Sequence, residues 1–147
     1  MNLSERLTDD MKQAMKSQEK FKLSTIRMMR ASVKNLEIDL KRPLDDNEVL
    51  DILSREIKQR KDSLQDFKKA GREDLVTGLE AEIEIISQYL PEQLTEEEIQ
   101  EIVRQTIQEL GASSKADMGK VMSALMPKTK GRADGKLVNQ AVQQFLQ

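Results

Sequence analysis

Apolar side chains recur every three to four positions along almost the whole chain, and no stretch alternates apolar and polar residues. The first pattern is typical of amphipathic helices, whereas strict alternation is typical of strands. The first two predicted helices cover residues 3–17 and 20–40. The apolar stripe of the second predicted helix consists of Ile26, Met29, Val33, Leu36 and Leu40. The pattern therefore predicts an all-α protein.

Capping residues divide the amino-terminal region into long helices. Asp45, followed three residues later by Glu48, predicts a capping box at the start of a long third helix. Gly71 is placed to end that helix in the left-handed conformation. A fourth helix follows and is stopped by Pro91. We therefore expect residues 1–92 to form an amino-terminal domain of long helical hairpins.

A second domain is expected over residues 93–147. Thr95 and Glu98 form the clearest capping box in the sequence, and Gly111 predicts the end of the fifth helix. Three helices are predicted in this region, so the expected architecture is a carboxyl-terminal three-helix bundle.

The last two predicted helices are separated by a basic loop. Ser114 is expected to cap a short sixth helix, which Pro127 should terminate. Asp134 is the expected cap of the final helix. The apolar face of this helix is predicted to contain Leu137, Val138, Ala141, Val142 and Phe145.

The composition excludes several kinds of chemistry. The 147 residues include no cysteine and no histidine, so thiol nucleophiles, thiolate metal sites and imidazole bases are absent. Aromatic residues make up 3% of the chain, too few to form a platform for stacking bases. We expect no cofactor and no metal. No apolar stretch resembles a signal peptide or a membrane span, so the expectation is a cytoplasmic protein without membrane contact.

The net charge of −2 conceals strong local bias. Residues 12–34 contain seven basic side chains and one acidic one, a net charge of +6. Residues 91–110 contain six acidic side chains and one basic one (−5), and residues 111–147 contain six basic and two acidic ones (+4). Both basic regions allow two interpretations, an ordinary solvated surface or a contact with a polyanion.

The carboxyl-terminal basic region has additional features of an anion site. Its cations lie on a loop and the start of a helix, beside two glycines that permit close approach of a ligand. Lysine and arginine attract phosphates irrespective of base sequence. Three residues lie between the glycines, where a nucleotide-binding P-loop has four, and no strand precedes them, so the segment does not fit a P-loop. The residues of this loop and helix start are Lys128, Lys130, Gly131, Arg132, Gly135 and Lys136.

Five segments of the chain are distinctive: residues 56–63 (EIKQRKDS), 70–75 (AGREDL), 89–94 (YLPEQL), 113–122 (SSKADMGKVM) and 128–139 (KTKGRADGKLVN). In these segments the chain resembles the YqeY family of small bacterial proteins. That family is in turn similar to the tail domain of GatB, a subunit of the glutamine-dependent amidotransferase that acts on misacylated tRNA.

The resemblance implies a two-part helical protein that interacts with tRNA and performs no chemistry itself. In GatB the tail helps to hold tRNA, and the same domain is appended to some glutaminyl-tRNA synthetases. The family label of carbon–nitrogen ligase with glutamine as amide donor belongs to the larger enzyme, whose activating portion is absent here. Three further residues are expected to support the basic loop in binding RNA: Lys115, Lys120 and Asn139.

Two other functions stay open at this point. The acidic fifth helix and a row of methionines could instead dock a protein, such as an aminoacyl-tRNA synthetase or an amidotransferase component. The third alternative is an amide-transfer enzyme. The methionine row consists of Met118, Met122 and Met126.

Overall fold

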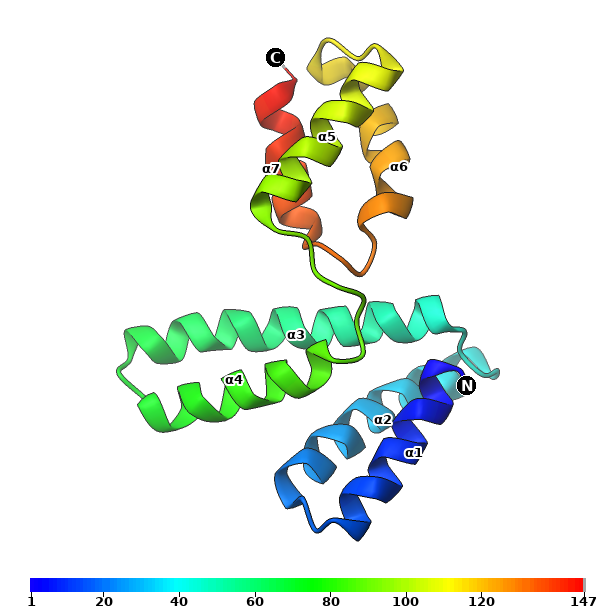
Figure 1. Cartoon of the computed structure of the whole chain (residues 1–147), viewed down its shortest axis with the longest axis vertical. Helices are drawn as coiled ribbons and strands as arrows, with labels where there is room; N and C mark the ends of the chain where they lie inside the picture. The colour runs from blue at the N-terminus through cyan, green and yellow to red at the C-terminus, as the bar shows by residue number, and fades with distance from the viewer. Residues whose placement is uncertain (147) are drawn as a thin grey trace. The chain divides into compact units, whose positions relative to one another are not determined.

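The computed structural model describes residues 1–146, and all regular structure in this range is helical, as the sequence pattern predicts (Figure 1). No helix in this range is both long and apolar enough to cross a membrane. Contacts within the chain divide it into two compact units, Met1–Leu90 and Pro91–Gln147. The helices are α1 Leu3–Lys16, α2 Lys20–Leu40, α3 Asp46–Lys69, α4 Glu73–Ser87, α5 Glu96–Leu110, the 3₁₀ turn η1 Lys115–Asp117, α6 Met118–Thr129 and α7 Gly135–Phe145.

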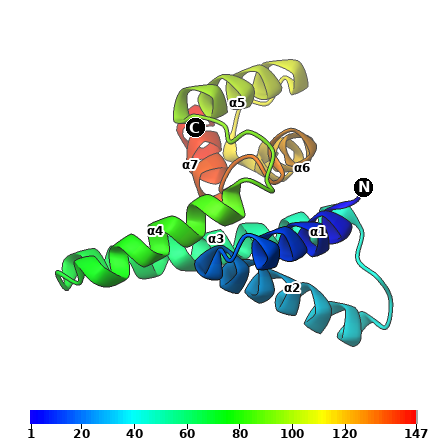
Figure 2. The same ribbon diagram turned by 60° about the horizontal axis from the view of Figure 1, so that its bottom comes forward.

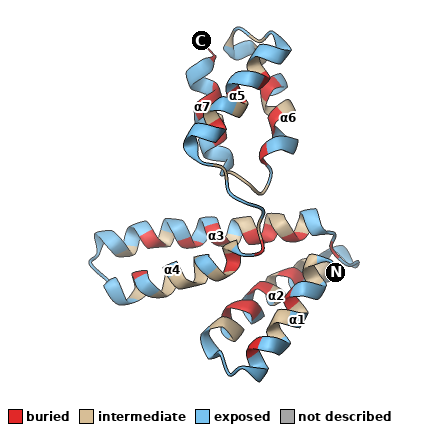
Figure 3. Ribbon diagram, in the orientation of Figure 1, coloured by how far each residue is buried: buried red, intermediate tan, exposed pale blue. Residues whose placement is uncertain are grey.

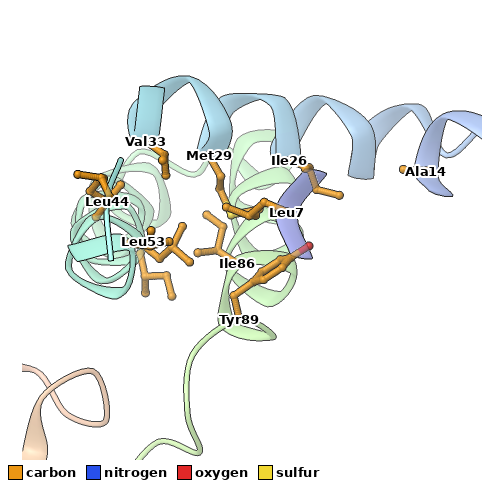
Figure 4. Packing of buried hydrophobic residues seen from close by; sticks show 12 residues of the cluster. Leu7, Ala14, Ile26, Met29, Val33, Leu44, Leu53, Ile86 and Tyr89 are labelled. Atoms are coloured by element: carbon orange, nitrogen blue, oxygen red, sulfur yellow. The ribbon is translucent and has the colours of Figure 1, made fainter. Parts of the chain in front are cut away.

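Unit 1 consists of two antiparallel hairpins, α1 with α2 and α3 with α4 (Figures 1 and 2). Its core is formed by the apolar stripes that the helical period predicts. Leu7 of α1, Met29 of α2 and Ile86 of α4 point toward one another in this core, and all three are fully buried (Figure 4). Burial of such side chains contributes about 1.5–3 kcal/mol each to folding.

The predicted start and end of α3 are confirmed. Asp45 accepts a hydrogen bond from the N–H of Glu48, and the Glu48 carboxylate accepts one from the N–H of Asp45. Hydrogen bonds from Arg42 and from the Asp45 backbone lower the pKa of Glu48 to about 2. Gly71 has a φ of 70°, the left-handed conformation that ends the helix.

A buried arginine joins three helices of unit 1. Arg60 of α3 is only 9% exposed and donates hydrogen bonds to Glu56 on its own helix and to Glu82 on α4, the latter at 2.8 Å. Ser32 of α2 donates to the same Glu56 carboxylate. Burial alone would lower the pKa of Arg60, but the two carboxylates outweigh it and the pKa is raised. The network therefore holds a charge in the core by surrounding it with acceptors.

A second polar cluster attaches the end of α4 to α1. The hydroxyl of Tyr89 donates a hydrogen bond to the carboxylate of Asp10, and the guanidinium of Arg6 lies 4.5 Å above the Tyr89 ring centroid. Burial and the hydrogen bond to Asp10 raise the pKa of Tyr89. Arg6 also donates to the carbonyl of Gln88. These contacts hold the last residues of unit 1 in place after α4 has ended.

Unit 2 is a bundle of α5, α6 and α7 with a core of its own. Figure 3 shows the buried residues of these helices on the faces that they turn toward one another. The predicted capping box of Thr95 and Glu98 and the left-handed Gly111 are both confirmed. The buried core residues of this unit are Ile99, Val103, Val121, Leu125, Val138, Ala141, Val142 and Leu146.

Two predictions for the sixth helix are wrong. Pro127 does not terminate α6, because it lies in the final turn of the helix. Proline there removes only its own N–H donor from the helical hydrogen bonds. The N–H of Lys130 still donates to the carbonyl of Met126 at 3.0 Å. Ser114 does not cap the helix through its side chain. Instead the Asp117 carboxylate accepts a hydrogen bond from the N–H of Ser113 at 3.1 Å.

The carboxyl end of α7 also differs from the prediction. Phe145 continues the apolar period of the helix but is 41% exposed, whereas Leu146 is 1% exposed. The chain leaves the helical conformation at Leu146, where the backbone becomes extended. This change turns the side chain of Leu146, instead of that of Phe145, into the core.

Replacing Arg60 tests the buried network. We expect Arg60→Ala to lower the free energy of unfolding by about 2–4 kcal/mol, because Glu56 and Glu82 would lose the charge-assisted hydrogen bonds that they accept from the buried guanidinium. Urea denaturation followed by circular dichroism measures this change. The matched control is Arg72→Ala, whose ion pair with Asp74 is exposed and should contribute less than about 1 kcal/mol. A loss at Arg60 no larger than at Arg72 would contradict this role of the network.

Candidate polyanion-binding loop

The candidate site is the basic loop, residues 130–134, between α6 and α7. Gly131 has a φ of 74°, a conformation that side chains with a Cβ rarely adopt. The N–H groups of Arg132 and Ala133 both donate to the carbonyl of Thr129, at 2.9 and 3.1 Å. Asp134 caps α7, as predicted, by accepting a hydrogen bond from the N–H of Lys136 at 3.0 Å. Local bonds therefore define the turn on both sides.

Residues 92–94, which precede α5, hold the loop by three hydrogen bonds, here called the clasp. The N–H of Leu94 donates to the carbonyl of Arg132 at 2.8 Å, and the side-chain amide of Gln93 donates to the carbonyl of Gly131 at 2.8 Å. In return, the guanidinium of Arg132 donates to the carbonyl of Glu92 at 3.3 Å. The clasp therefore joins segments of unit 2 that are about 40 positions apart in the sequence.

The predicted cations of the loop differ in their exposure and in the groups that they contact. Lys130 and Lys136 are exposed, and Arg132 is partly buried through the clasp. Lys128 is directed to α5, where it donates to the hydroxyl of Thr106 at 3.1 Å and lies 3.6 Å from the carboxylate of Glu109. Lys128 is therefore partly neutralised, which the sequence did not reveal.

The structure separates two predicted residues from the others. Lys115 lies in η1 and Lys120 in the first turn of α6, whereas the loop follows the last turn of α6 (Figure 1). A helix of 12 residues such as α6 is about 18 Å long at 1.5 Å per residue. Lys115 and Lys120 therefore lie at the end of unit 2 opposite to the loop and cannot share one phosphate with it.

The start of α7 continues the exposed surface of the loop. A Cβ added to Gly135 would meet no atom within 4 Å, so the space over this residue is open. Asn139 lies one turn further along α7, and its side-chain oxygen accepts a hydrogen bond from Gln143 at 2.9 Å. The amide N–H₂ of Asn139 can therefore still donate to a ligand.

Sequence reasoning missed the residues that position the loop. Glu92 and Gln93 belong to a segment quoted for the family resemblance, but no role followed from their positions in the sequence. In the sequence these two residues are visible only as a short polar stretch between Pro91 and the capping box of α5. Such a signal predicts a linker and does not identify the distant loop to which the linker binds.

These features define a helical protein with two separate cores and a basic loop that is held by hydrogen bonds to main-chain carbonyls. The chain belongs to the YqeY family: the family model described as Yqey-like protein matches residues 4–146. The resemblance found in the sequence is thereby confirmed. The protein is a helical module of this family.

Relatives from fungi are similar over part or most of the chain. The protein "Altered inheritance of mitochondria protein 41, mitochondrial" of Pyrenophora tritici-repentis is 34% identical over 144 residues, covering 96% of this chain and 79% of the relative. The proteins of that name from Lachancea thermotolerans and Saccharomyces cerevisiae (strain YJM789) are 44% and 39% identical over 85 residues. Both of these alignments cover 57% of this chain and 46% of the relative, so the matched part is about half of each of those two proteins.

The names of these relatives correct the expected location. All three are named as mitochondrial proteins, which contradicts a cytoplasmic assignment. That assignment depended on the lack of an apolar stretch, a test that detects signal peptides and membrane spans. Import sequences for mitochondria are amphipathic and basic instead, so the test had no power to identify them.

The methionine row does not form one exposed surface. Met118 and Met122 pack against the core of unit 2, whereas Met126 is 60% exposed. Residues separated by four positions drift around a helix by about 40° per step, so the row turns from the core toward solvent.

Substitutions of the two loop glycines test the backbone of the loop. We expect Gly131→Ala to lower the stability of unit 2 by about 1–2 kcal/mol, because alanine is strained at this positive φ. Gly135→Ala is the matched control and should raise stability by up to about 1 kcal/mol, since its site is open and helical. Hydrogen exchange of buried amides in α6 measures both changes. Equal effects at the two positions would show that Gly131 is not in the left-handed conformation.

Proposed function

We propose that this protein is a non-catalytic tRNA-binding module, in which the basic loop and the start of α7 contact backbone phosphates. It acts in aminoacyl-tRNA metabolism, in association with tRNA-dependent amidation. The observation that carries the proposal is the clasp, which holds the backbone at Gly131 and Arg132 between the exposed Lys130 at the start of the loop and the exposed Lys136 in the first turn of α7. A loop held in this way loses little conformational freedom when it binds.

Three other features support the proposal. Residues 111–147 carry a net charge of +4. The loop lies in the segment 128–139 that resembles the tail domain of GatB, which helps to hold tRNA. Scarce aromatic residues favour recognition of charge and shape over recognition of single bases.

Lys115 and Lys120 have a different role in this proposal from the one first expected. They lie at the far end of α6, about 15 Å or more from the loop along the helix axis. Consecutive phosphates of one RNA strand are much closer together than this. Lys115 and Lys120 would therefore contact a second part of the same tRNA. Their contribution should be smaller than that of the loop and separable from it.

Charge reversal in the loop tests the proposal. We expect Lys130→Glu with Lys136→Glu to weaken tRNA binding about tenfold or more at low salt, because two phosphate contacts are lost. The slope of log K against log salt concentration should also fall by about 2. Filter binding or fluorescence anisotropy at several salt concentrations measures both quantities.

The matched control reverses two exposed lysines of α3, Lys61→Glu with Lys69→Glu. This variant has the same net charge as the loop variant, so it reports the effect of overall charge alone. Equal losses of affinity in the two variants would contradict binding through the loop. Affinity that is independent of salt in the unmodified protein would contradict binding of a polyanion altogether.

A protein partner is the second candidate function. In unit 2, the exposed apolar side chain of Met126 and the acidic first turn of α5 are the features that would favour it. An aminoacyl-tRNA synthetase or amidotransferase component that stays bound after nuclease treatment and a wash at high salt would support this candidate over RNA binding.

A further inference from the structure

The turn between α1 and α2 of unit 1 has no part in the proposed function. In Figure 1 this turn lies at the free end of the hairpin, away from α3 and α4. Ala14 is the last buried residue of α1, and the buried residues of α2 begin with Thr25. The residues between these two, 15–24, are here called the hairpin tip, and none of them is buried.

Backbone hydrogen bonds hold the turn of the hairpin tip. The N–H of Glu19 donates to the carbonyl of Ala14 at 3.0 Å, and the N–H of Gln18 donates to the carbonyl of Met15 at 3.3 Å. These two bonds, with Gln18 in the left-handed conformation (φ of 56°), form a Schellman motif. The helix α2 begins directly afterwards, at Lys20. The side chains around the turn therefore project from an ordered backbone.

Two large apolar side chains of the hairpin tip are exposed to solvent. Phe21 is 47% exposed and Met15 is 51% exposed. Side chains of an α-helix are inclined toward its N-terminus, so Phe21, in the first turn of α2, is directed toward the end of the hairpin. Exposed apolar residues are by themselves common on protein surfaces. The charges around these two distinguish the hairpin tip from an ordinary surface.

Nearly all charges around these apolar side chains are positive. The hairpin tip and the helical turn on each side of it, residues 12–27, contain five basic residues and one acidic residue, Glu19, a net charge of +4. Within residues 1–146 none of the five basic side chains forms an ion pair or a hydrogen bond. Their charges are therefore available to a partner. The five residues are Lys12, Lys16, Lys20, Lys22 and Arg27.

The opposite end of α2 combines exposed apolar residues with the opposite charge. Ile38 is 70% exposed and Leu40 is 42% exposed. Residues 37–46 contain four acidic and two basic side chains, a net charge of −2. The two ends of one helix therefore differ in the charge that surrounds their apolar side chains, and the acidic end serves as a control for the hairpin tip.

We propose that the hairpin tip binds the surface of an anionic lipid bilayer, with its lysines against the headgroups and Phe21 in the apolar layer below them. Such a bilayer offers negative charge and, within about 5–10 Å, an apolar layer. Lysine stems lie along apolar surface while their ammonium groups stay with the headgroups. RNA would also neutralise the lysines, but it would leave Met15 without an apolar partner. A contact of this kind needs no spanning helix, so it departs from the expectation of no membrane contact, which concerned apolar stretches alone.

Binding of the full chain to lipid vesicles tests the proposal. We expect co-sedimentation with vesicles of phosphatidylcholine that contain phosphatidylglycerol, weaker binding as salt is added, and no binding to phosphatidylcholine alone. Lys16→Glu with Lys20→Glu should weaken the binding about 25-fold or more, because each basic side chain near the surface contributes about fivefold. The control, Lys61→Glu with Lys69→Glu, has the same net charge and should weaken it far less.

A tryptophan placed in the hairpin tip detects insertion, because the chain contains no tryptophan of its own. The fluorescence of Phe21→Trp should shift to the blue with anionic vesicles, whereas that of Ile38→Trp, the control, should not shift. Both substitutions replace exposed side chains, so both variants should fold. Phe21→Ala should also weaken vesicle binding several-fold, because less apolar surface enters the bilayer.

Absence of binding to anionic vesicles would overturn the proposal. Equal weakening by the two charge-reversed variants, or an equal fluorescence response at positions 21 and 38, would overturn it in favour of adsorption through overall charge. A blue shift of Phe21→Trp with tRNA and none with vesicles would overturn it in favour of RNA. The vesicles contain no RNA and the hairpin tip lies in unit 1, so the vesicle results are independent of whether the loop of unit 2 binds tRNA.

Discussion

The clasp between residues 92–94 and the loop at 131–132 is the constraint that fixes the backbone of the basic loop in unit 2. Without it, the loop between α6 and α7 would be a connection of five residues with a glycine as its second residue. Its carbonyls at Gly131 and Arg132 are both used by the clasp, so the backbone cannot rearrange without losing two hydrogen bonds. The exposed side chains of Lys130 and Lys136 flank this backbone.

Two arginines of unit 1 have different surroundings. In unit 1, Arg60 is surrounded by carboxylates and contributes to the fold, since removing its partners would leave a charge with little water. Arg30, on the neighbouring helix α2, is partly exposed and donates to the thioether of Met11, so its remaining N–H groups need no carboxylate partner.

The basic loop of unit 2 was predictable to different degrees at its different residues. Gly131, Arg132 and Lys136 could be assigned to one loop because they are close in sequence and flanked by helix signals. Lys128 could not be judged in the same way, since its partners Thr106 and Glu109 lie about 20 residues earlier on α5. The distance of Lys115 and Lys120 from the loop followed only once α6 was known to extend through Pro127 to Thr129.

The sequence by itself determined the local structure of this protein. Helical periods, the capping boxes at Asp45 and Thr95, and the glycines at the helix ends act over a few residues, so they can be interpreted without knowing the fold. The tertiary structure alone decided which distant groups meet: Gln93 with Gly131, Arg60 with Glu82, and Tyr89 with Asp10. Such contacts depend on how helices pack, and packing directions are set by many weak apolar contacts that no short motif encodes.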